Sequence, residues 1–341
     1  MVWPRARAIR MRRPLVLYIN MRITSTILHL LLHLTAALVL AMATATTLHA
    51  QQDPAFQQYW QVETQFNPAA AGRLQQLQVK GAYQQHASGF EDGGSTMFAG
   101  ADMAFRIGNT LHGVGAAFQS DQIGLFAHQR FSVQYAYHWR VLGGTLSIGA
   151  EADMLNEKVD GAKADPGDAN DPAIPSSEVS GSKLDASAGL WFTHRRWYAG
   201  IGVQHLTAPT VLLGATHEIE IKQTYNFTAG YNIRTNNPLF TIVPSTMLRY
   251  DGVELRTDLT ARLIYQREKK RLYGGANYSA GHSVALFVGG DFHGIDLCYS
   301  YEANTEGIGM QSGQHEITLC YRMDLDLGKK GRNRHKSLRY L

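Results

Sequence analysis

The sequence predicts an all-β fold, a transmembrane antiparallel β-barrel of about 14 strands with a short N-terminal segment before the first strand. Three observations support this prediction: apolar and polar side chains alternate along most of the chain, the alternating segments are long, and short turns alternate with longer loops. Successive side chains of a strand point to opposite faces, so such segments form strands with one apolar and one polar face.

Residues 1–50 have the composition of a secretory leader. They contain six arginines and no acidic residue, with an apolar stretch over Ile27–Met42 and small residues up to Ala50. A basic region, an apolar region and a small residue at the cut describe a signal peptide. The apolar stretch is short for a bilayer span, and two histidines interrupt it. We therefore predict a cleaved signal peptide that starts at Met1 or Met21, rather than an anchor helix.

The net charge is unevenly distributed. Removing the six leader arginines changes the formal charge from +4 to −2, and setting aside the six cations of residues 329–341 leaves −8 for the body. A basic protein raises the question of nucleic acid. Here the basic residues lie in a removable leader and a short tail, so the sequence argues against nucleic acid as a partner. For the tail we expect a solvated periplasmic end, or a contact with acidic periplasmic partners.

Residues 51–73, QQDPAFQQYWQVETQFNPAAAGR, separate the leader from the first alternating segment. The stretch holds two X-Pro turns, several aromatic residues and a run of small residues. We interpret it as an N-terminal segment at the periplasmic mouth that plugs the barrel or meets a partner. An ordered lead-in to the first strand is the alternative.

The barrel body is predicted over residues 74–328. In HQRFSVQYAYHWRV, for example, every second residue is apolar and the intervening ones are mostly polar or charged. Many segments are longer than the usual soluble strand, whereas tilted membrane strands need about 9 to 11 residues. The expected strands cover 74–86, 95–107, 112–121, 128–141, 144–158, 183–195, 196–206, 221–234, 240–250, 253–267, 270–280, 283–293, 295–303 and 314–327.

The connections are an independent test, because a soluble sandwich would not gather its long loops at one end. The even-numbered links are all short, and the odd-numbered links include every long one, notably 160–182 and 207–220. Outer-membrane barrels have short periplasmic turns and longer external loops. The pattern therefore predicts an outer-membrane barrel with both termini in the periplasm.

No catalytic or metal-binding motif fits this architecture. Gly281–Ala285 approximates a hydrolase elbow, but Ser283 falls at a strand-to-strand hairpin instead of a strand-to-helix turn. The sequences that begin at His217 and His315 start like H-E-x-x-H, yet both lack the second histidine and lie on strands. A lipid-hydrolysing barrel would need a Ser/His pair, and the spacing selects none. We predict no enzymatic activity, no cofactor and no metal site.

Several charged residues and both cysteines fall on the polar face of the strands. Cys298 and Cys320 lie on the last two strands, where an oxidised pair and two free thiols are both compatible with the sequence. The charges would form a hydrated or salt-bridged interior, or a selectivity filter. They are Glu151, Asp153, Arg256, Asp258, Arg262, Asp296, Glu316, Arg322 and Asp324.

Two phrases before the first strand, and the closing strand, resemble a known family. The closing strand Glu316–Met323 is similar to its final E-I-x-L-x-Y-x-F pattern, and residues 51–327 resemble the PorP/SprF family as a whole. These are outer-membrane proteins of the type IX secretion and gliding apparatus of Bacteroidetes-type bacteria. Gln57 and Met323 depart from the usual Ser and aromatic residue. The two phrases hold the residues of the candidate partner or plug segment, and the second phrase also includes Ala69 and Ala71. These candidate residues are Gln52, Asp53, Pro54, Phe56, Gln58, Tyr59, Asn67, Pro68 and Gly72.

The resemblance implies a non-enzymatic barrel that anchors or assists secretion and surface attachment. Its expected partners are outer-membrane lipids and either periplasmic ring components with their peptidoglycan-linked proteins or the C-terminal domain of a surface adhesin. A different class of function is the alternative, namely a diffusion channel or a transporter of hydrophobic substrates. Conductance through the lumen would distinguish the two.

Overall fold

The computed structural model describes residues 53–86, 93–161, 177–214, 217–268, 270–305 and 313–324. The chain divides into two units, Met1–Ala50 and Gln51–Leu341, and everything below concerns the second. The expected signal peptide, Gln52 and the basic tail lie outside the described residues.

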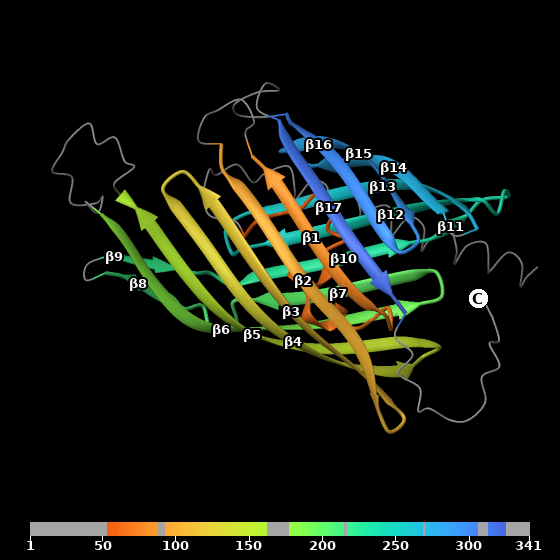
Figure 1. The fold of residues 1–341 in the computed structure, drawn as a ribbon, viewed down its shortest axis with the longest axis horizontal. Helices are drawn as coiled ribbons and strands as arrows, with labels where there is room; N and C mark the ends of the chain where they lie inside the picture. The colour runs from red at the N-terminus through yellow and green to blue at the C-terminus, as the bar shows by residue number, and fades with distance from the viewer. Residues whose placement is uncertain are drawn as a thin grey trace, which may run out of the picture. The chain divides into compact units, whose positions relative to one another are not determined.

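Fourteen strands form the barrel wall. Each pairs antiparallel with its neighbours along the chain except where β7 passes to β10, and β1 pairs with β17 to close the barrel (Figure 1). The wall strands are β1 Leu77–Gln85, β2 Ser95–Ile107, β3 Thr110–Ile123, β4 Phe126–Val141, β5 Gly144–Asp160, β6 Glu178–His194, β7 Trp197–Gln204, β10 Thr224–Tyr231, β12 Phe240–Tyr250, β13 Leu255–Arg267, β14 Lys270–Ser279, β15 Ser283–Phe292, β16 Ile295–Asn304 and β17 Gln314–Met323.

The predicted fold class is therefore confirmed, and three details differ from the expected segments. The strip β11 (Ile233–Arg234) continues the line of β10 and pairs with β12, so one expected strand is two pieces. The link expected to be a loop at 207–220 holds a hairpin of β8 (Thr210–Leu213) and β9 (His217–Glu220). In addition, β6 begins five residues before the expected start because it follows β5 beyond the rest of the wall.

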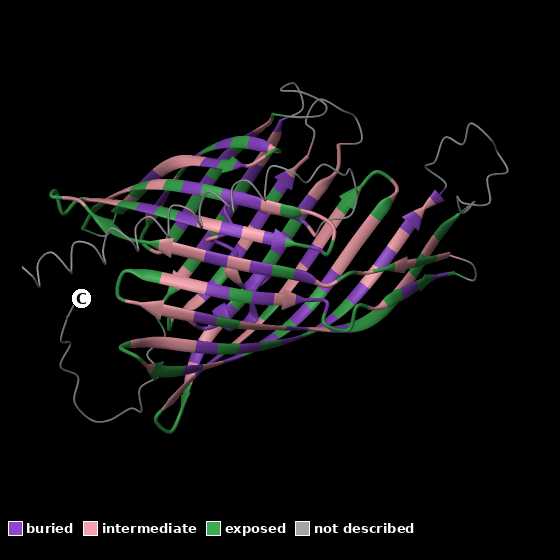
Figure 2. Cartoon of the chain, turned by 180° about the vertical axis from the view of Figure 1, so that it is seen from behind, coloured by how far each residue is buried: buried purple, intermediate pink, exposed green. Residues whose placement is uncertain are grey.

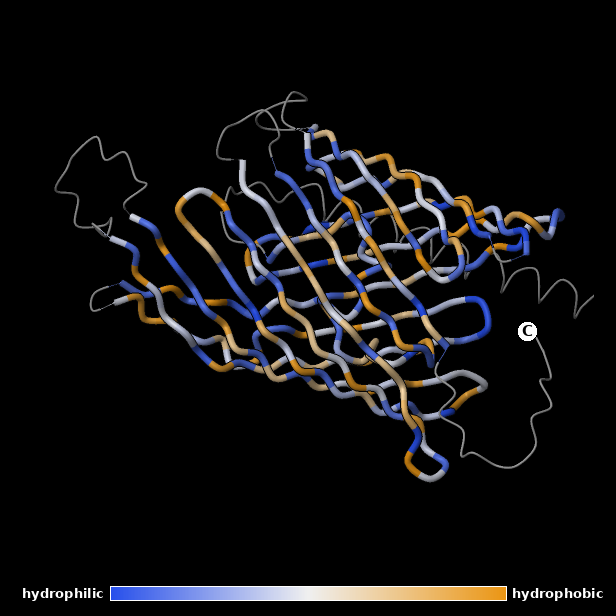
Figure 3. The backbone as a smooth tube through the Cα atoms, in the orientation of Figure 1, coloured by the Kyte–Doolittle hydropathy of each residue, from blue (hydrophilic) through white to orange (hydrophobic). Residues whose placement is uncertain are grey.

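The wall is amphipathic, with one apolar and one polar face, as the alternation in the sequence predicts. Along β4, Phe131, Val133 and Trp139 are exposed on the outside, while Gln134 and His138 are buried inside. The same banding follows most wall strands (Figure 2), and hydropathy alternates with it (Figure 3). An apolar outer surface suits lipid, and closure leaves no unpaired edge in the bilayer. Among the described residues, no helix has the length and apolar character to cross a membrane.

The two ends of the barrel differ. At one end lie the start of β1, the end of β17 and six short hairpins, five of them with two-residue turns; we call this end the terminal mouth. Leu142 and Gly143 form one such turn with positive φ of 52° and 70°, as tight hairpins require. The other end, the loop mouth, carries the long connections between strands, including the β8–β9 hairpin, which packs on the projecting part of β6.

Candidate functional site: the lumenal segment and the terminal mouth

Residues 53–76, the lumenal segment, run through the barrel interior, contact inward-facing side chains around its wall and become exposed at Leu74 and Gln75. Two short 3-10 turns, η1 (Glu63–Gln65) and η2 (Pro68–Ala70), give the segment its shape. The side chain of Asn67 caps η2 by accepting a hydrogen bond of 3.0 Å from the amide of Ala69, and Pro68 fills the first helical position. Both features follow from the sequence, since Asn is a favoured N-cap and Pro a favoured first residue.

The described start of the segment lies closer to the loop mouth than the rest of it. The carbonyl of Asp53 accepts a hydrogen bond of 3.0 Å from Arg249, near the loop-mouth end of β12. Its carboxylate lies 3.3 Å from Nε2 of His205, just after β7. The segment then descends through the lumen to β1, so it extends further into the barrel than the mouth position that the sequence predicts. The difference arises because strand counting fixes where β1 starts and says nothing of the path before it.

Glu316 of β17 holds the first turn of the segment. Its carboxylate accepts hydrogen bonds from the backbone amides of Gln57 at 2.7 Å and Gln58 at 3.0 Å. The side chain of Gln58 donates to Ser300 at 3.2 Å and accepts from Thr318. A buried carboxylate that accepts two amides satisfies donors that would otherwise be costly inside the barrel.

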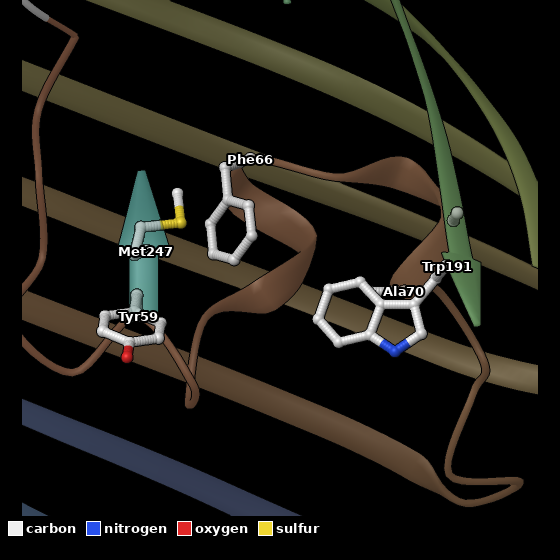
Figure 4. Packing of buried hydrophobic residues seen from close by; sticks show 6 residues of the cluster. Tyr59, Phe66, Ala70, Trp191 and Met247 are labelled. Atoms are coloured by element: carbon white, nitrogen blue, oxygen red, sulfur yellow. The ribbon is translucent and has the colours of Figure 1, made fainter. Parts of the chain in front are cut away.

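Apolar side chains of the segment pack against two parts of the wall. Tyr59 and Phe66 cluster with Trp191 of β6 and Met247 of β12, as Figure 4 shows. Phe56 forms a second cluster with Phe98 of β2, with ring centroids 6.3 Å apart. These contacts supply the hydrophobic part of the packing between the segment and the wall, since most other lumenal positions are polar.

The carbonyl groups of the segment are satisfied by side chains of the wall. Arg130 donates to the carbonyl of Gln65 at 2.7 Å, and Gln204 donates to the same oxygen at 3.0 Å. Gln134 donates to the carbonyl of Thr64 at 2.7 Å. Buried backbone groups need such partners, so these inward side chains are matched to an irregular segment.

Four inward-facing glycines line the path of residues 66–71. A Cβ on any of them would lie between 2.0 and 2.4 Å from an atom of the segment, closer than real contacts allow. The wall there is therefore reduced to backbone, and it forms a groove that fits the segment. This glycine groove consists of Gly113 of β3, Gly149 of β5, Gly189 of β6 and Gly202 of β7.

Gly72 ends the small-residue run and requires a glycine for two reasons. Its φ is +69°, and a Cβ would lie 2.6 Å from the Cα of Gly113. Its amide donates 2.9 Å to Asp102, which also pairs with Lys80 at 2.8 Å. In the N-P-A-x-A-G phrase, Asn67, Pro68 and Gly72 therefore each have a structural reason.

A cavity of about 700 Å³ lies at the terminal mouth, beside the segment and the wall of β13 to β17. Trp60, Leu74 and Ile264 give it an apolar side, and three arginines give it a charged side. The guanidinium of Arg262 lies 4.4 Å from the centroid of the Trp60 ring, a cation–π contact. This mouth cavity is lined by Trp60, Gln61, Leu74, Gln76, Arg262, Ile264, Arg271, Tyr273, Asp291, His293, Gly294, Arg322 and Asp324.

Asp296 is the centre of a polar network behind this cavity. Tyr273 donates to it at 2.6 Å, Gln61 at 3.0 Å and Arg322 at 3.1 Å, and Arg271 forms an ion pair with it. Arg322 also bonds Asp291 at 3.0 Å. Asp291 and Asp296 are therefore already paired with two of the three arginines, while Asp324 accepts a hydrogen bond from Gln76.

The structure brings the predicted lumenal charges into three places. Glu151 and Asp153 are buried on β5, where Gln134 and Ser132 donate to them. Arg256 pairs with Asp258 and Glu302. Arg262 and Arg322 line the mouth cavity, where Asp324 lies exposed just beyond β17.

The cysteines and the near-motif residue are lumenal as well. Cys298 and Cys320 are buried free thiols, offset by two residues across β16 and β17. Ser283 begins β15 after a strand-to-strand turn and donates to Glu302. Within the described residues, no group of three His, Cys, Asp or Glu side chains could hold a metal ion.

Sequence reasoning missed the glycine groove, Arg130 and His205. The four glycines do fall on inward-facing positions of their strands, so alternation marks them as unusual small residues on a polar face. Arg130 and His205 offered no comparable signal, because their partners are backbone and carboxylate groups far away in the sequence.

These features define a class, an outer-membrane β-barrel whose interior is occupied by its own N-terminal segment. Residues 48–321 match the family described as the type IX secretion system membrane protein PorP/SprF, and the chain belongs to that family. The family resemblance found in the sequence is therefore confirmed.

No curated protein matches the chain. Among solved structures, the chain is similar to a FadL homologue of Pseudomonas aeruginosa, with 10% identity, a TM-score of 0.45 and coverage of 73% of this chain and 89% of that one. It is also similar to the toluene transporter TodX of Pseudomonas putida, with 10% identity, a TM-score of 0.45 and coverage of 76% and 92%. For the outer membrane protein Omp33 of Acinetobacter baumannii the identity is 8%, the TM-score 0.40 and the coverage 73% and 98%.

Proposed function

We propose that this chain is a non-enzymatic anchor and docking partner of the type IX secretion system. Its barrel would hold periplasmic ring components, or the C-terminal domain of a surface adhesin, at the outer membrane. The observation that supports this role is the occupied lumen. Phe56, Gln58 and Asn67 are buried inside the barrel, and bonds to both sides of the wall hold the segment.

The same observation argues against the alternative of a diffusion channel. Water-filled porins keep a polar lumen open, whereas here the segment occupies the lumen and is hydrogen bonded to both sides of the wall. The terminal mouth would face the periplasm, because short turns are periplasmic in outer-membrane barrels. The mouth cavity would then be available to periplasmic partners.

Conductance in planar bilayers tests the anchor role against the channel. The full chain should show no steady conductance, and a variant lacking residues 53–72 should conduct in defined steps. Steady conductance of the full chain would favour the channel and refute the anchor proposal.

Cross-linking in cells tests the docking role directly. We expect the full chain to yield type IX components and the variant lacking residues 53–72 to insert in the outer membrane without them. Insertion is checked by the heat-dependent migration of folded barrels on gels. Recovery of the same components from the truncated chain would remove the lumenal segment from the docking site.

A further inference from the structure

The terminal mouth carries positive charge that the described carboxylates do not neutralise. Arg106, Arg140 and Arg234 lie near its hairpins, are exposed, and form no ion pair with a described residue. Arg106 and Arg140 continue the inward rows of β2 and β4, and Arg234 pairs with Thr241 beside the inward row of β12. The charges therefore border the opening rather than the lipid-facing wall.

Arg262 brings the same charge into the mouth cavity. Arg271 and Arg322 share Asp291 and Asp296, while Arg262 has no ion pair among the described residues. Its Nε is buried without a hydrogen-bond partner, and its guanidinium lies on the ring of Trp60. Arg262 is thus held in place by the ring of Trp60, and its guanidinium can still form hydrogen bonds.

We propose that the mouth cavity binds an acidic peptide segment of the periplasmic partner, with a carboxylate on Arg262 and apolar side chains against Trp60, Leu74 and Ile264. The proposal rests on the docking function above and names the chemistry of the partner. A guanidinium matches a carboxylate with two parallel donors, and the apolar walls strengthen that contact by excluding water. A cavity of about 700 Å³ is large enough for a few side chains.

The surroundings favour a peptide over a small anion. The cavity has an apolar side that an inorganic ion would leave uncovered, since Leu74 and Ile264 offer no hydrogen bond. Arg106, one of the bordering arginines, donates 3.4 Å to the side chain of Gln75, which stands between Leu74 and Gln76 of the cavity lining. An extended acidic chain can reach both Arg262 and the bordering charges, which would also accelerate its association.

Fluorescence anisotropy with the full-length protein in detergent micelles tests the proposal. The probe is a labelled octapeptide of alternating Leu and Glu, and the matched peptide has Gln for every Glu. Arg262→Gln is compared with Arg267→Gln, which removes an exposed charge from the same end of β13 on the other side of the wall. We expect Arg262→Gln to weaken binding of the acidic peptide about tenfold or more and Arg267→Gln by less than about twofold.

Any other result would contradict the proposed peptide site. Equal losses in both variants would mean diffuse attraction, and equal binding of the Gln peptide would mean apolar adsorption. Unchanged binding by Arg262→Gln would exclude that residue. Heat-dependent migration shows that both variants remain folded. If Arg262→Gln lost the peptide but still cross-linked to type IX components, the cavity would not be their docking site, while the proposed function would stand.

Discussion

The two sides of the barrel wall hold the lumenal segment in different ways. On the side of β3, β5, β6 and β7, four glycines let the backbone of the wall meet residues 66–71 directly, and Trp191 packs beside them. On the side of β13 to β17, Glu316, Asp296 and the arginines contact the segment through side chains, and a cavity remains. The first side fixes the position of the segment through shape, and the second side leaves room for a ligand.

This difference separates structural from functional roles. A backbone-to-backbone contact tolerates no added atom, because packed interiors have little free volume. A side-chain network can rearrange around a ligand, and the mouth cavity lies where such a network meets solvent. Substitutions on the glycine side should therefore change the stability of the docked segment, whereas Arg262 on the other side should mainly change binding.

Replacing a groove glycine should have the largest effect. In Gly149→Ala the new Cβ would lie 2.2 Å from the amide nitrogen of Ala69 and 2.4 Å from the carbonyl carbon of Pro68, so the segment must move. We expect a loss of about 3 kcal/mol in the free energy of unfolding, measured by urea titration in micelles. Faster proteolysis of the segment should accompany it.

Gly81→Ala is the matched control for this variant. It lies on β1, and the nearest atom to its Cβ would be the carbonyl oxygen of Phe98 at 3.9 Å. The added methyl group should change stability little. If both variants were equally destabilised, the cause would be the strand and not the groove.

The fold followed from the sequence because its determinants are local. Alternation specifies which side chains face lipid, and short turns such as Leu142-Gly143 specify where strands reverse. Neither depends on contacts between distant residues, so the positions of all fourteen wall strands could be predicted. The β8–β9 hairpin was missed because its strands are four residues long and one of them, His217–Glu220, has a single apolar residue, Ile219.

The site was predicted only in part. The phrase from Asp53 to Gly72 and the inward charges were recognised, yet which wall residue meets which segment residue depends on the closed barrel. Gly149 meets Pro68 and Ala69 from 81 and 80 residues away along the chain, and Gly189 meets Asn67 from 122 residues away. Only the assembled wall gives them a common partner, so no spacing in the sequence reveals the groove.

Glu316 offers a smaller test on the opposite side of the wall. Glu316→Ala would leave the amides of Gln57 and Gln58 without acceptors, which we expect to cost about 2 kcal/mol in unfolding free energy. Glu316→Gln keeps one acceptor oxygen and should cost roughly half as much. Hydrogen exchange of these two amides would locate the change. Equal effects of the two variants would show that lost charge, rather than lost acceptors, is responsible.

The smallest effect should come from the end of the segment nearest the loop mouth, where Asp53 contacts His205. Burial lowers the pKa of His205, but the charge of Asp53 and the hydrogen bonds to Asp185 and Asp53 outweigh it and raise the pKa from 6.5 to about 10. Burial raises the pKa of Asp53, while the charge of His205 and its hydrogen bond lower it further, so the net direction is down. Both groups are therefore charged when folded near neutral pH.

The sign of the pH dependence follows from these directions. A histidine whose pKa is raised on folding stabilises the folded state fully below 6.5, and this contribution is lost as the pH rises toward about 10. Because the pKa of Asp53 is lowered on folding, its stabilising contribution is lost only as the pH falls below 3.8. At pH 6 we expect the free energy of unfolding of the native chain to be about 1 kcal/mol higher than that of His205→Gln. This difference should shrink as the pH approaches 10. Urea midpoints of both proteins across this range measure it, and a difference independent of pH would mean that His205 acts through packing alone.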